Sequence, residues 1–211
     1  MNILCLNTAF KTATIAVRGK KTVFINLDAS AKSSENVLPA IENALMSAGI
    51  EIGDVDCVGV VVGPGSFTGV RVGVALVKGF MACFAKLKVV AINSLDLMAF
   101  EWQKTGNTSE FCAVQNALSG RFFVKEYQSF LPKTEASLEK NLPSAFKVGL
   151  ESEALSEVDA YVEPSEKTLL EMTENLIKEN QFVSKSQLAP VYLRLSQAEE
   201  NLLKKEENAE N

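Results

Sequence analysis

Residues 58–72 read Val-Gly-Val-Val-Val-Gly-Pro-Gly-Ser-Phe-Thr-Gly-Val-Arg-Val, and the fold follows from this stretch. The apolar, β-branched run predicts a buried strand, the Gly-Pro-Gly turn ends it, and a helical pattern of apolar residues follows. Gly63 and Gly65 allow backbone angles that a β-carbon forbids, and Ser66 or Thr68 can cap the helix. The stretch therefore predicts a strand, a tight loop and a helix N-terminus.

The glycine loop has two interpretations at this point. In one, the backbone N–H groups at the helix start point outward and cradle a phosphate or a nucleotide. The residues near that ligand would then be Gly63, Gly65, Ser66, Phe67 and Thr68. In the other, the loop is an ordinary turn or a rigid elbow that presents the helix to a partner. The loop lacks the Gly-Lys-Ser/Thr ending of a P-loop, and Thr68 stands where a dinucleotide fingerprint has glycine, so neither standard nucleotide motif is present.

Composition removes several classes of function. The chain of 211 residues contains no histidine, which excludes His-dependent triads, His general bases and His metal ligands. Its net charge of −5 disfavours strong independent binding to nucleic acid, so any contact with RNA is expected to run through a partner. No apolar run approaches the ~20 residues of a membrane span, and the N-terminus lacks the basic region of a signal peptide. A cytoplasmic location without membrane contact is expected.

The four cysteines predict neither a redox pair nor a metal site. Cys5, Cys57, Cys83 and Cys112 lie far apart, each within an apolar stretch, so neither a CxxC pair nor a zinc spacing exists. All four are expected to be reduced residues of the core, and no metal ligands are predicted.

The first half of the chain has the order βββαβαβα. The expected elements are strands at 3–6, 14–17 and 22–27, a helix at 35–48 capped by Ser33 or Ser34 and stopped by Gly49, a strand at 57–62, a helix at 68–85, a strand at 88–92, and a helix capped by Ser94 that runs to about residue 103. A three-strand meander followed by alternating helices and strands is typical of the ribonuclease H-like lobe found in actin and in sugar kinases.

A second, smaller lobe is expected after the first. The pattern predicts a hairpin from strands at 111–115 and 121–127, a loop at 131–144 that can hold a short helix, a strand at 146–150 and a helix at 165–180. We therefore divide the chain into a ribonuclease H-like lobe at 1–105, a second lobe at 106–195 and a charged tail at 196–211. No internal repeat of constant period is evident in the sequence.

Five stretches together carry a family resemblance. Gly63–Gly73 closely resembles the signature of the TsaB (YeaZ-type) family, and so do Ile3–Thr8, Glu35–Ile41, the hairpin Asn116–Tyr127 and Pro190–Arg194. The similarity extends over most of residues 1–195 and is densest in the first lobe. It implies a two-lobed α/β protein with the actin-like ATPase fold.

The resemblance also implies a function. Members of this family are non-catalytic partners of TsaD, the metal-bearing actin-like protein that transfers a threonylcarbamoyl group to the tRNA adenosine beside the anticodon, and the ATPase TsaE joins the assembly. Contact with tRNA would be indirect, no cofactor would be bound by this chain alone, and ATP and Mg²⁺ would lie at the interface of the complex or in the partner subunits. The family was formerly labelled a glycoprotease, but a chain without histidine cannot build the His-metal site that this label requires.

Three polar landmarks of the family pattern are changed in this chain. The first strand ends in Asn7 rather than aspartate, the His-Ser/Thr before the first helix is Ser33-Ser34, and the Asp-Ala-Arg of the second lobe is Asn116-Ala117-Leu118. An amide cannot ionise to bind Mg²⁺ as a carboxylate does, so Asn7 argues against a kinase-type phosphate site and a two-metal nuclease. The simpler interpretation is that Asn7 is a turn residue that closes the strand.

The resemblance places the partner interface on the two helices at 35–48 and 68–85. The predicted interface residues are Val37, Leu38, Ile41, Leu45, Gly69, Val70, Arg71, Gly73, Val74, Val77 and Lys78. Packing in the chain's own core is the alternative for each residue of the apolar stripe. Arg71 and Lys78 are the exceptions, because they are charged groups on a mostly apolar helix. Arg71 lies in the first helical turn, where a cation opposes the helix dipole unless an anion answers it. That anion would belong to TsaD or to an ATP phosphate, and a solvated arginine is the alternative.

Two rival functions remain from other classes. The chain could be a small actin-like ATPase or kinase that uses the glycine loop, or a homodimer that has no contact with TsaD.

Overall fold

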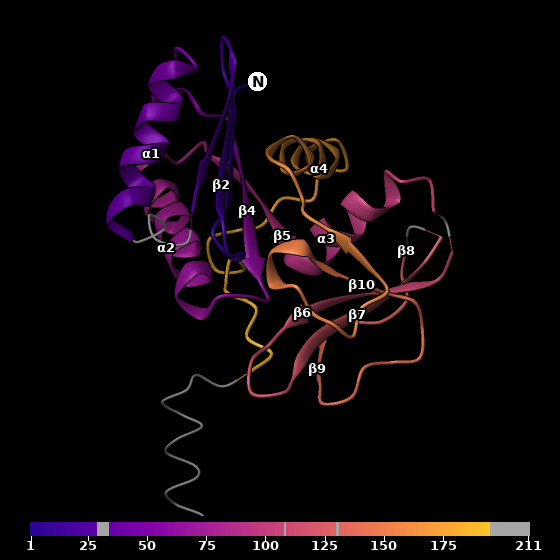
Figure 1. The fold of residues 1–211 in the computed structure, drawn as a ribbon. Coiled ribbons are helices and arrows are strands. Elements are labelled where there is room, and N and C mark those ends of the chain that lie inside the picture. Colours follow the sequence, from indigo (N-terminus) through magenta and orange to yellow (C-terminus); the bar gives the residue numbers. More distant parts are fainter. Residues whose placement is uncertain (29–33, 108, 130, 195–211) are drawn as a thin grey trace, which may run out of the picture.

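The computed structural model describes residues 1–28, 34–107, 109–129 and 131–194 of the chain. They form two mixed sheets with four α-helices, as Figure 1 shows. The predicted two-lobed, actin-like α/β fold is confirmed. The predicted tail at 196–211 and the predicted cap Ser33 lie outside the described residues.

The first sheet has the strand order β3-β2-β1-β4-β5. Its strands are β1 (Ile3–Asn7), β2 (Ala13–Arg18), β3 (Thr22–Leu27), β4 (Cys57–Gly63) and β5 (Lys88–Asn93). The first three pair antiparallel, and β4 and β5 run parallel to β1. The helices that follow β3, β4 and β5 are α1 (Ser34–Ser47), α2 (Phe67–Cys83) and α3 (Ser94–Gln103). This order confirms the predicted βββαβαβα lobe, with small shifts at the ends of elements.

The second sheet repeats the same topology in a reduced form. Its strands are β6 (Phe111–Asn116), β7 (Phe122–Gln128), β8 (Leu131–Pro132), β9 (Ser137–Glu139), β10 (Lys147–Leu150) and β11 (Ala160–Val162). A meander of β6, β7 and the short strands β8 and β9 is followed by β10 and β11, which run parallel to β6. The short helix expected within 131–144 is wrong, because this stretch instead pairs its backbone with β7.

Alternate residues of a strand point to opposite faces of the sheet, and their contacts show which helix covers each face of the first sheet. A β-carbon on Gly73 of α2 would lie 3.8 Å from Leu6 and 3.7 Å from Val60, so these side chains face α2. The intervening residues face the other way, toward α4 (Glu166–Lys178), where the Cys5 thiol donates to Thr173 Oγ1 at 3.3 Å. In Figure 1, α1 and α2 accordingly lie on one side of this sheet and α4 on the other.

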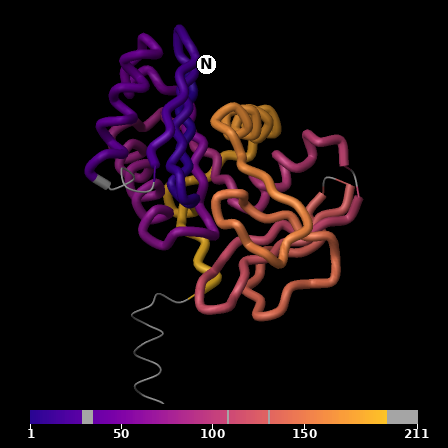
Figure 2. Tube along the Cα trace, in the orientation of Figure 1, coloured from indigo at the N-terminus to yellow at the C-terminus, as the bar shows by residue number. Residues whose placement is uncertain are grey.

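The two sheets share the helices α3 and α4. The helix α4 follows the last strand of the second sheet but packs on the first, whereas α3 follows the first sheet and packs on β6 and β10 of the second. In Figures 1 and 2, α3 lies between the two sheets, and α4 lies above it against the first sheet. An ion pair of 2.7 Å between Asp96 of α3 and the buried Lys125 of β7 reinforces this junction. The expected lobe boundary at residue 105 lies between the two sheets in the sequence. However, α3 precedes the boundary and packs on the second sheet, and α4 follows it and packs on the first.

Two helix termini refine the predicted capping. Ser66 caps α2, as expected, because its Oγ accepts from the Gly69 N–H at 3.2 Å. The prediction that Ser94 caps α3 is wrong. The neighbouring Asn93 caps this helix by accepting from the Leu95 N–H at 2.9 Å, so the Ser94 hydroxyl is free to bond elsewhere.

A glycine ends α1, and the four cysteines are free thiols. Gly49 ends α1 with a left-handed φ of 73°, as expected. Three cysteines are buried free thiols, and burial raises the pKa of each to about 12: Cys5, Cys57 and Cys112. Cys83 is a free thiol but is exposed at the end of α2, so its predicted place in the core is wrong.

Candidate functional site

The glycine loop lies directly against the turn that joins β1 and β2. The Ser66 N–H donates to Ala9 O at 2.9 Å, and the Thr8 hydroxyl donates to Gly69 O at 2.6 Å. A β-carbon on Gly69 would lie only 1.9 Å from Thr8 O. The loop amides of Ser66 and Gly69 are therefore bonded within the chain rather than pointed outward, and glycine is required so that two backbones can approach.

Asn7 is a turn residue, as expected. Its side chain is buried, and its Oδ1 accepts from the Ala9 N–H at 3.0 Å. This bond closes β1 and turns the chain toward the glycine loop. The amide therefore shapes the turn on which α2 rests.

A cleft of about 480 Å³ opens between the two lobes next to this loop. Its walls come from the β1–β2 turn, the start of α2, the β6–β7 hairpin and the segment after α4. The lining residues are Ala9, Phe10, Lys11, Gly65, Ser66, Phe67, Thr68, Val70, Asn116, Ala117, Leu118, Phe123, Glu153, Val191, Tyr192, Leu193 and Arg194. Four of the five predicted ligand-proximal residues are thus at the cleft, and Gly63 lies behind it, buried.

Buried polar groups connect the glycine loop with the second lobe beneath this cleft. The Ser94 hydroxyl donates to Pro64 O and lies 3.1 Å from Gln115 Oε1. In the next residue, the Asn116 N–H donates to Glu153 Oε2 at 2.7 Å. Desolvation by burial raises the pKa of Glu153 to about 7, and the negative charge of Glu163 adds to that shift. Sequence reasoning missed Gln115 and Glu153, because neither belongs to a motif or follows a periodic pattern.

Arg71 belongs to a small aromatic cluster at the start of α2. Its guanidinium carbon lies 3.8 Å from the centroid of the Phe67 ring, and its Nε donates to the Tyr192 hydroxyl at 2.7 Å. The rings of Phe67 and Tyr192 are 5.0 Å apart. Within the described residues, the cation is therefore met by ring faces and a phenol oxygen.

Most of the predicted interface residues lie inside the lobe. Eight of them are buried and pack α1 and α2 onto the first sheet: Val37, Ile41, Leu45, Gly69, Val70, Gly73, Val74 and Val77. The six larger side chains among them are 4 % exposed or less and pack in the chain's own core, which is the alternative given for the apolar stripe. Leu38 and Arg71 are exposed, and Lys78 is half-buried.

The exposed face of α2 consists of other residues. Ala75, Gly79, Ala82 and Cys83 are exposed along its outer side, and Val72, Leu76 and Phe80 are half-buried beside them. We call these seven residues the outer face of α2. These residues also recur at the helical period. In the sequence, however, the larger apolar residues of the buried stripe give the stronger periodic pattern, so this face does not stand out.

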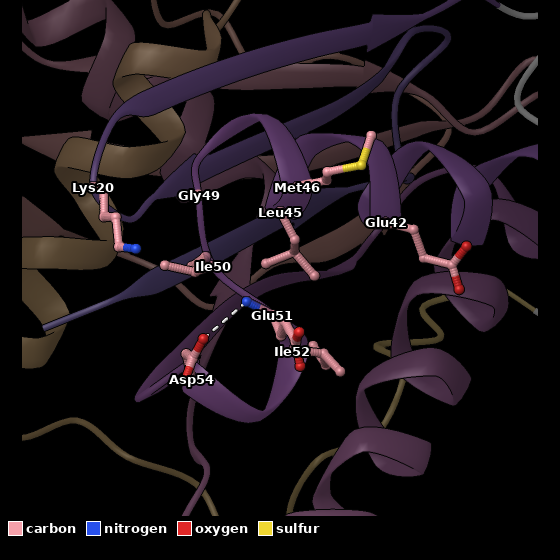
Figure 3. Close-up of a pocket in the computed structure, with 9 residues that line it drawn as sticks. All are labelled: Lys20, Glu42, Leu45, Met46, Gly49, Ile50, Glu51, Ile52 and Asp54. Carbon is pink, nitrogen blue, oxygen red and sulfur yellow. Dashed lines mark hydrogen bonds between the residues drawn. The ribbon is translucent and has the colours of Figure 1, made fainter.

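A second hollow of about 720 Å³ lies at the end of α1 and is drawn in Figure 3. Apolar and charged residues line it together: Lys20, Glu42, Leu45, Met46, Gly49, Ile50, Glu51, Ile52 and Asp54. In Figure 3, the Asp54 carboxylate accepts from the Glu51 N–H at 2.9 Å. A β-carbon on Gly53 would lie 3.7 Å from Phe84, so the turn at 52–54 that borders this hollow lies near the end of α2.

The described residues hold neither a cluster of metal ligands nor a helix able to cross a membrane. No group of three or more cysteine, aspartate or glutamate side chains within them could hold a metal ion. Within the same ranges, no helix is both long and apolar enough to cross a membrane.

Curated relatives of this chain share one name. The protein of Escherichia coli called "tRNA threonylcarbamoyladenosine biosynthesis protein TsaB" is 31 % identical over 130 residues, which are 61 % of this chain and 55 % of that protein. The TsaB of Haemophilus influenzae is 38 % identical over 101 residues, or 47 % of this chain and 42 % of that protein. The matched part spans about half the length of these curated relatives.

A solved structure agrees with the fold. The structure titled "YeaZ from Pseudomonas aeruginosa" superposes with a TM-score of 0.76 over 91 % of this chain and 99 % of that chain. Because the two sequences are only 20 % identical, this likeness shows the fold alone.

The sheets, the shared helices and the interlobe cleft define a two-lobed protein of the actin-like class. A family model described as "TsaD: tRNA N6-adenosine threonylcarbamoyltransferase" matches residues 25–140, a little over half of the chain. The chain belongs to this family, and its named relatives place it in the TsaB (YeaZ-type) branch.

The close approach at Gly69 gives a first prediction. We expect Gly69→Ala to lower the free energy of unfolding by about 3 kcal/mol, because its β-carbon would overlap Thr8 O. The control is Gly79→Ala in the same helix, where nothing lies within 4 Å of the added carbon. This control should raise stability by about 1 kcal/mol through helix propensity. Urea unfolding measures both, and equal effects at the two positions would contradict the packing argument.

Glu153 gives a second prediction. Its folded pKa of about 7 lies above the ordinary value of 4.5, so the folded protein loses stability as the pH rises from about 4.5 to 7. We expect Glu153→Gln to raise the free energy of unfolding by about 1–2 kcal/mol at pH 8 and by much less at pH 5. Urea unfolding at both pH values tests this, with the exposed Glu135→Gln as control. A gain that is the same at both pH values would contradict the assignment.

Proposed function

We propose that this chain is the TsaD-binding subunit of the machinery that makes threonylcarbamoyladenosine in tRNA. Membership of the TsaD family supports this, and so do the names of the TsaB relatives. In this proposal the chemistry belongs to a TsaD homologue, and this chain contributes a docking surface. The TsaE ATPase would join the larger assembly, and tRNA would be reached through the partner.

The outer face of α2 is the observation that carries this proposal. In its 17 residues, α2 has only two charged side chains, Arg71 and Lys78. The outward side of a surface helix is normally charged or polar, whereas a helix that is apolar on all sides is normally buried. Because Ala75, Gly79 and Ala82 are small, a helix from another chain can approach closely and pack its ridges into the grooves between them.

Residues of α1 extend this surface. Leu38 is 38 % exposed and Met46 is 73 % exposed, both on the outward side of α1. Together with the outer face of α2 they would let two helices of this chain meet a helix pair of the partner. Docking can activate the partner only if its active arrangement binds this surface more tightly than its inactive one.

A catalytic role for this chain is not part of the proposal. The sequence has no histidine, so the chain cannot supply the His ligands that the former glycoprotease label requires. Asn7 replaces a carboxylate that could bind Mg²⁺, and its amide oxygen is used in the turn. ATP and Mg²⁺ would be held in the partner subunits or at the shared interface.

Arg71 is the residue through which this chain would meet an anion at that interface. Phe67 and Tyr192 hold its guanidinium at the edge of the outer face, and Nε is already bonded to the Tyr192 hydroxyl. The terminal nitrogens can form a bidentate pair with a carboxylate of the partner or with a phosphate. A charge reversal, Arg71→Glu, would therefore weaken partner binding or tRNA modification.

The α2 face gives the third prediction. We expect Gly79→Arg to weaken binding to the TsaD homologue of the same organism by at least about 100-fold, because the long charged side chain would be forced into a helix contact. The substitution is suited to the test because nothing lies within 4 Å of a β-carbon at Gly79. Titration calorimetry measures the affinity, and Ser156→Arg, at an exposed site of the second lobe, is the control.

The same variants separate the proposal from a homodimer without TsaD. If the wild-type chain binds no TsaD homologue, and Gly79→Arg only breaks a dimer of this chain, the homodimer interpretation is favoured. If both variants bind the homologue like the wild type, the α2 face is not the interface.

The interlobe cleft favours one second candidate, a small ATPase. Lys11 lines this cleft beside the start of α2, where its amine would meet a phosphate of a bound nucleotide. Mg²⁺-dependent ATP hydrolysis by the purified chain, lost in Lys11→Ala, would favour this candidate. Lys11 is the better target than Gly65, because a β-carbon on Gly65 would lie 2.7 Å from Ala9 O and disturb the fold itself.

A further inference from the structure

The described part of the chain ends in a segment that crosses the mouth of the interlobe cleft. We call Pro190–Arg194 the C-terminal clasp. The Val191 N–H donates to Val62 O at 2.8 Å, which fixes the segment to the end of β4. Val191, Tyr192, Leu193 and Arg194 all line the cleft. The clasp therefore starts on the first lobe and forms part of the cleft wall.

Tyr192 holds the clasp to the start of α2. Its ring lies 5.0 Å from the ring of Phe67, and its hydroxyl accepts from Arg71 Nε at 2.7 Å. The Arg71 guanidinium is also 5.4 Å from the centroid of the Tyr192 ring. Three side chains from two distant parts of the sequence thus form one layer on the first lobe.

Arg194 holds the other end of the clasp to the second lobe. Its guanidinium donates to Ala117 O, and Nη2 lies 3.4 Å from Ser119 Oγ. These acceptors belong to the β6–β7 hairpin, where Leu118 and Ser119 adopt left-handed φ values of 63° and 55°. Such a backbone is less favourable for residues other than glycine, so outside contacts help to hold it.

We infer that the C-terminal clasp locks the two lobes across the cleft and sets the position of both the β6–β7 hairpin and Arg71. The lobes are joined on one side by the shared helices α3 and α4. On the cleft side, the hydrogen bonds of the clasp and of Ser94 with Gln115 join the lobes. Opening the clasp would free the hairpin and release Arg71 together.

This inference does not depend on the proposed function. It concerns the chain alone, and it holds whether the α2 face binds a TsaD homologue, a second copy or nothing. It predicts that a change at Tyr192 is felt at residues 116–122, which bond to the clasp through Arg194.

Hydrogen exchange followed by mass spectrometry on the full chain tests this. We expect Tyr192→Ala and Arg194→Gln each to speed amide exchange in the hairpin at 116–122 by about tenfold, the effect of losing one hydrogen bond or ring contact. Tyr161→Ala is a matched control. Tyr161 is 46 % exposed like Tyr192, and its hydroxyl donates to Leu155 O at 2.6 Å within the second lobe.

The conservative variant Tyr192→Phe separates the two contacts of the tyrosine. It keeps the ring against Phe67 but removes the acceptor for Arg71, so its hairpin exchange should lie between those of the wild type and Tyr192→Ala. Unchanged hairpin exchange in both Tyr192→Ala and Arg194→Gln would overturn the clasp. So would a rise of the same size in Tyr161→Ala. If Tyr192→Ala fails to fold, Arg194→Gln and Tyr192→Phe decide the question.

Discussion

The contact between the β1–β2 turn and the first turn of α2 is the constraint on which the other features of the site depend. The backbone oxygens of Ala9 and Thr8 lie so close to Gly65 and Gly69, respectively, that neither glycine has room for a β-carbon. The Thr8 hydroxyl also donates to Gly69 O. Backbone amides that could hold a phosphate are used here to fix a helix. The signature loop is thus best explained as an elbow that sets the direction of α2.

This elbow has consequences on both sides of the molecule. On the outside, it presents a helix whose outer face carries alanine, glycine and cysteine where a solvated helix carries charges. On the inside, it forms one wall of the cleft, opposite the β6–β7 hairpin. Because α3 and α4 are shared by the two sheets, these walls belong to one packed unit. A partner that grips α2 would therefore act on the whole chain rather than on a separate lobe.

Local chemistry in the sequence was enough to predict the first lobe. The β-branched run, the Gly-Pro-Gly turn and the helical period fix β4 and α2, and Asn7 has the turn role that an asparagine at a strand end suggests. Periodicity also found the inward stripe of both helices. Periodicity does not show which side of a helix binds a partner, because apolar residues such as Val70 and Val74 pack in the chain's own core.

The remaining features depend on contacts between distant residues. Arg194 meets Ala117, 77 positions earlier in the sequence, and Asn116 meets Glu153, 37 positions later. The topological repeat of the second sheet is hidden because its strands are short and helices between them are replaced by loops. In place of the short helix expected within 131–144, this stretch forms the short strands β8 and β9, which are held by backbone pairing to β7.

The central claim is that the α2 face is a docking surface for a TsaD-type partner. Size-exclusion chromatography with light scattering tests this claim most directly. The chain would be run alone, with the TsaD homologue of its own organism, and with that homologue plus ATP and Mg²⁺. The account predicts one new species whose mass equals the sum of one copy of each chain. Two unshifted species in both mixtures, with and without ATP and Mg²⁺, would contradict it.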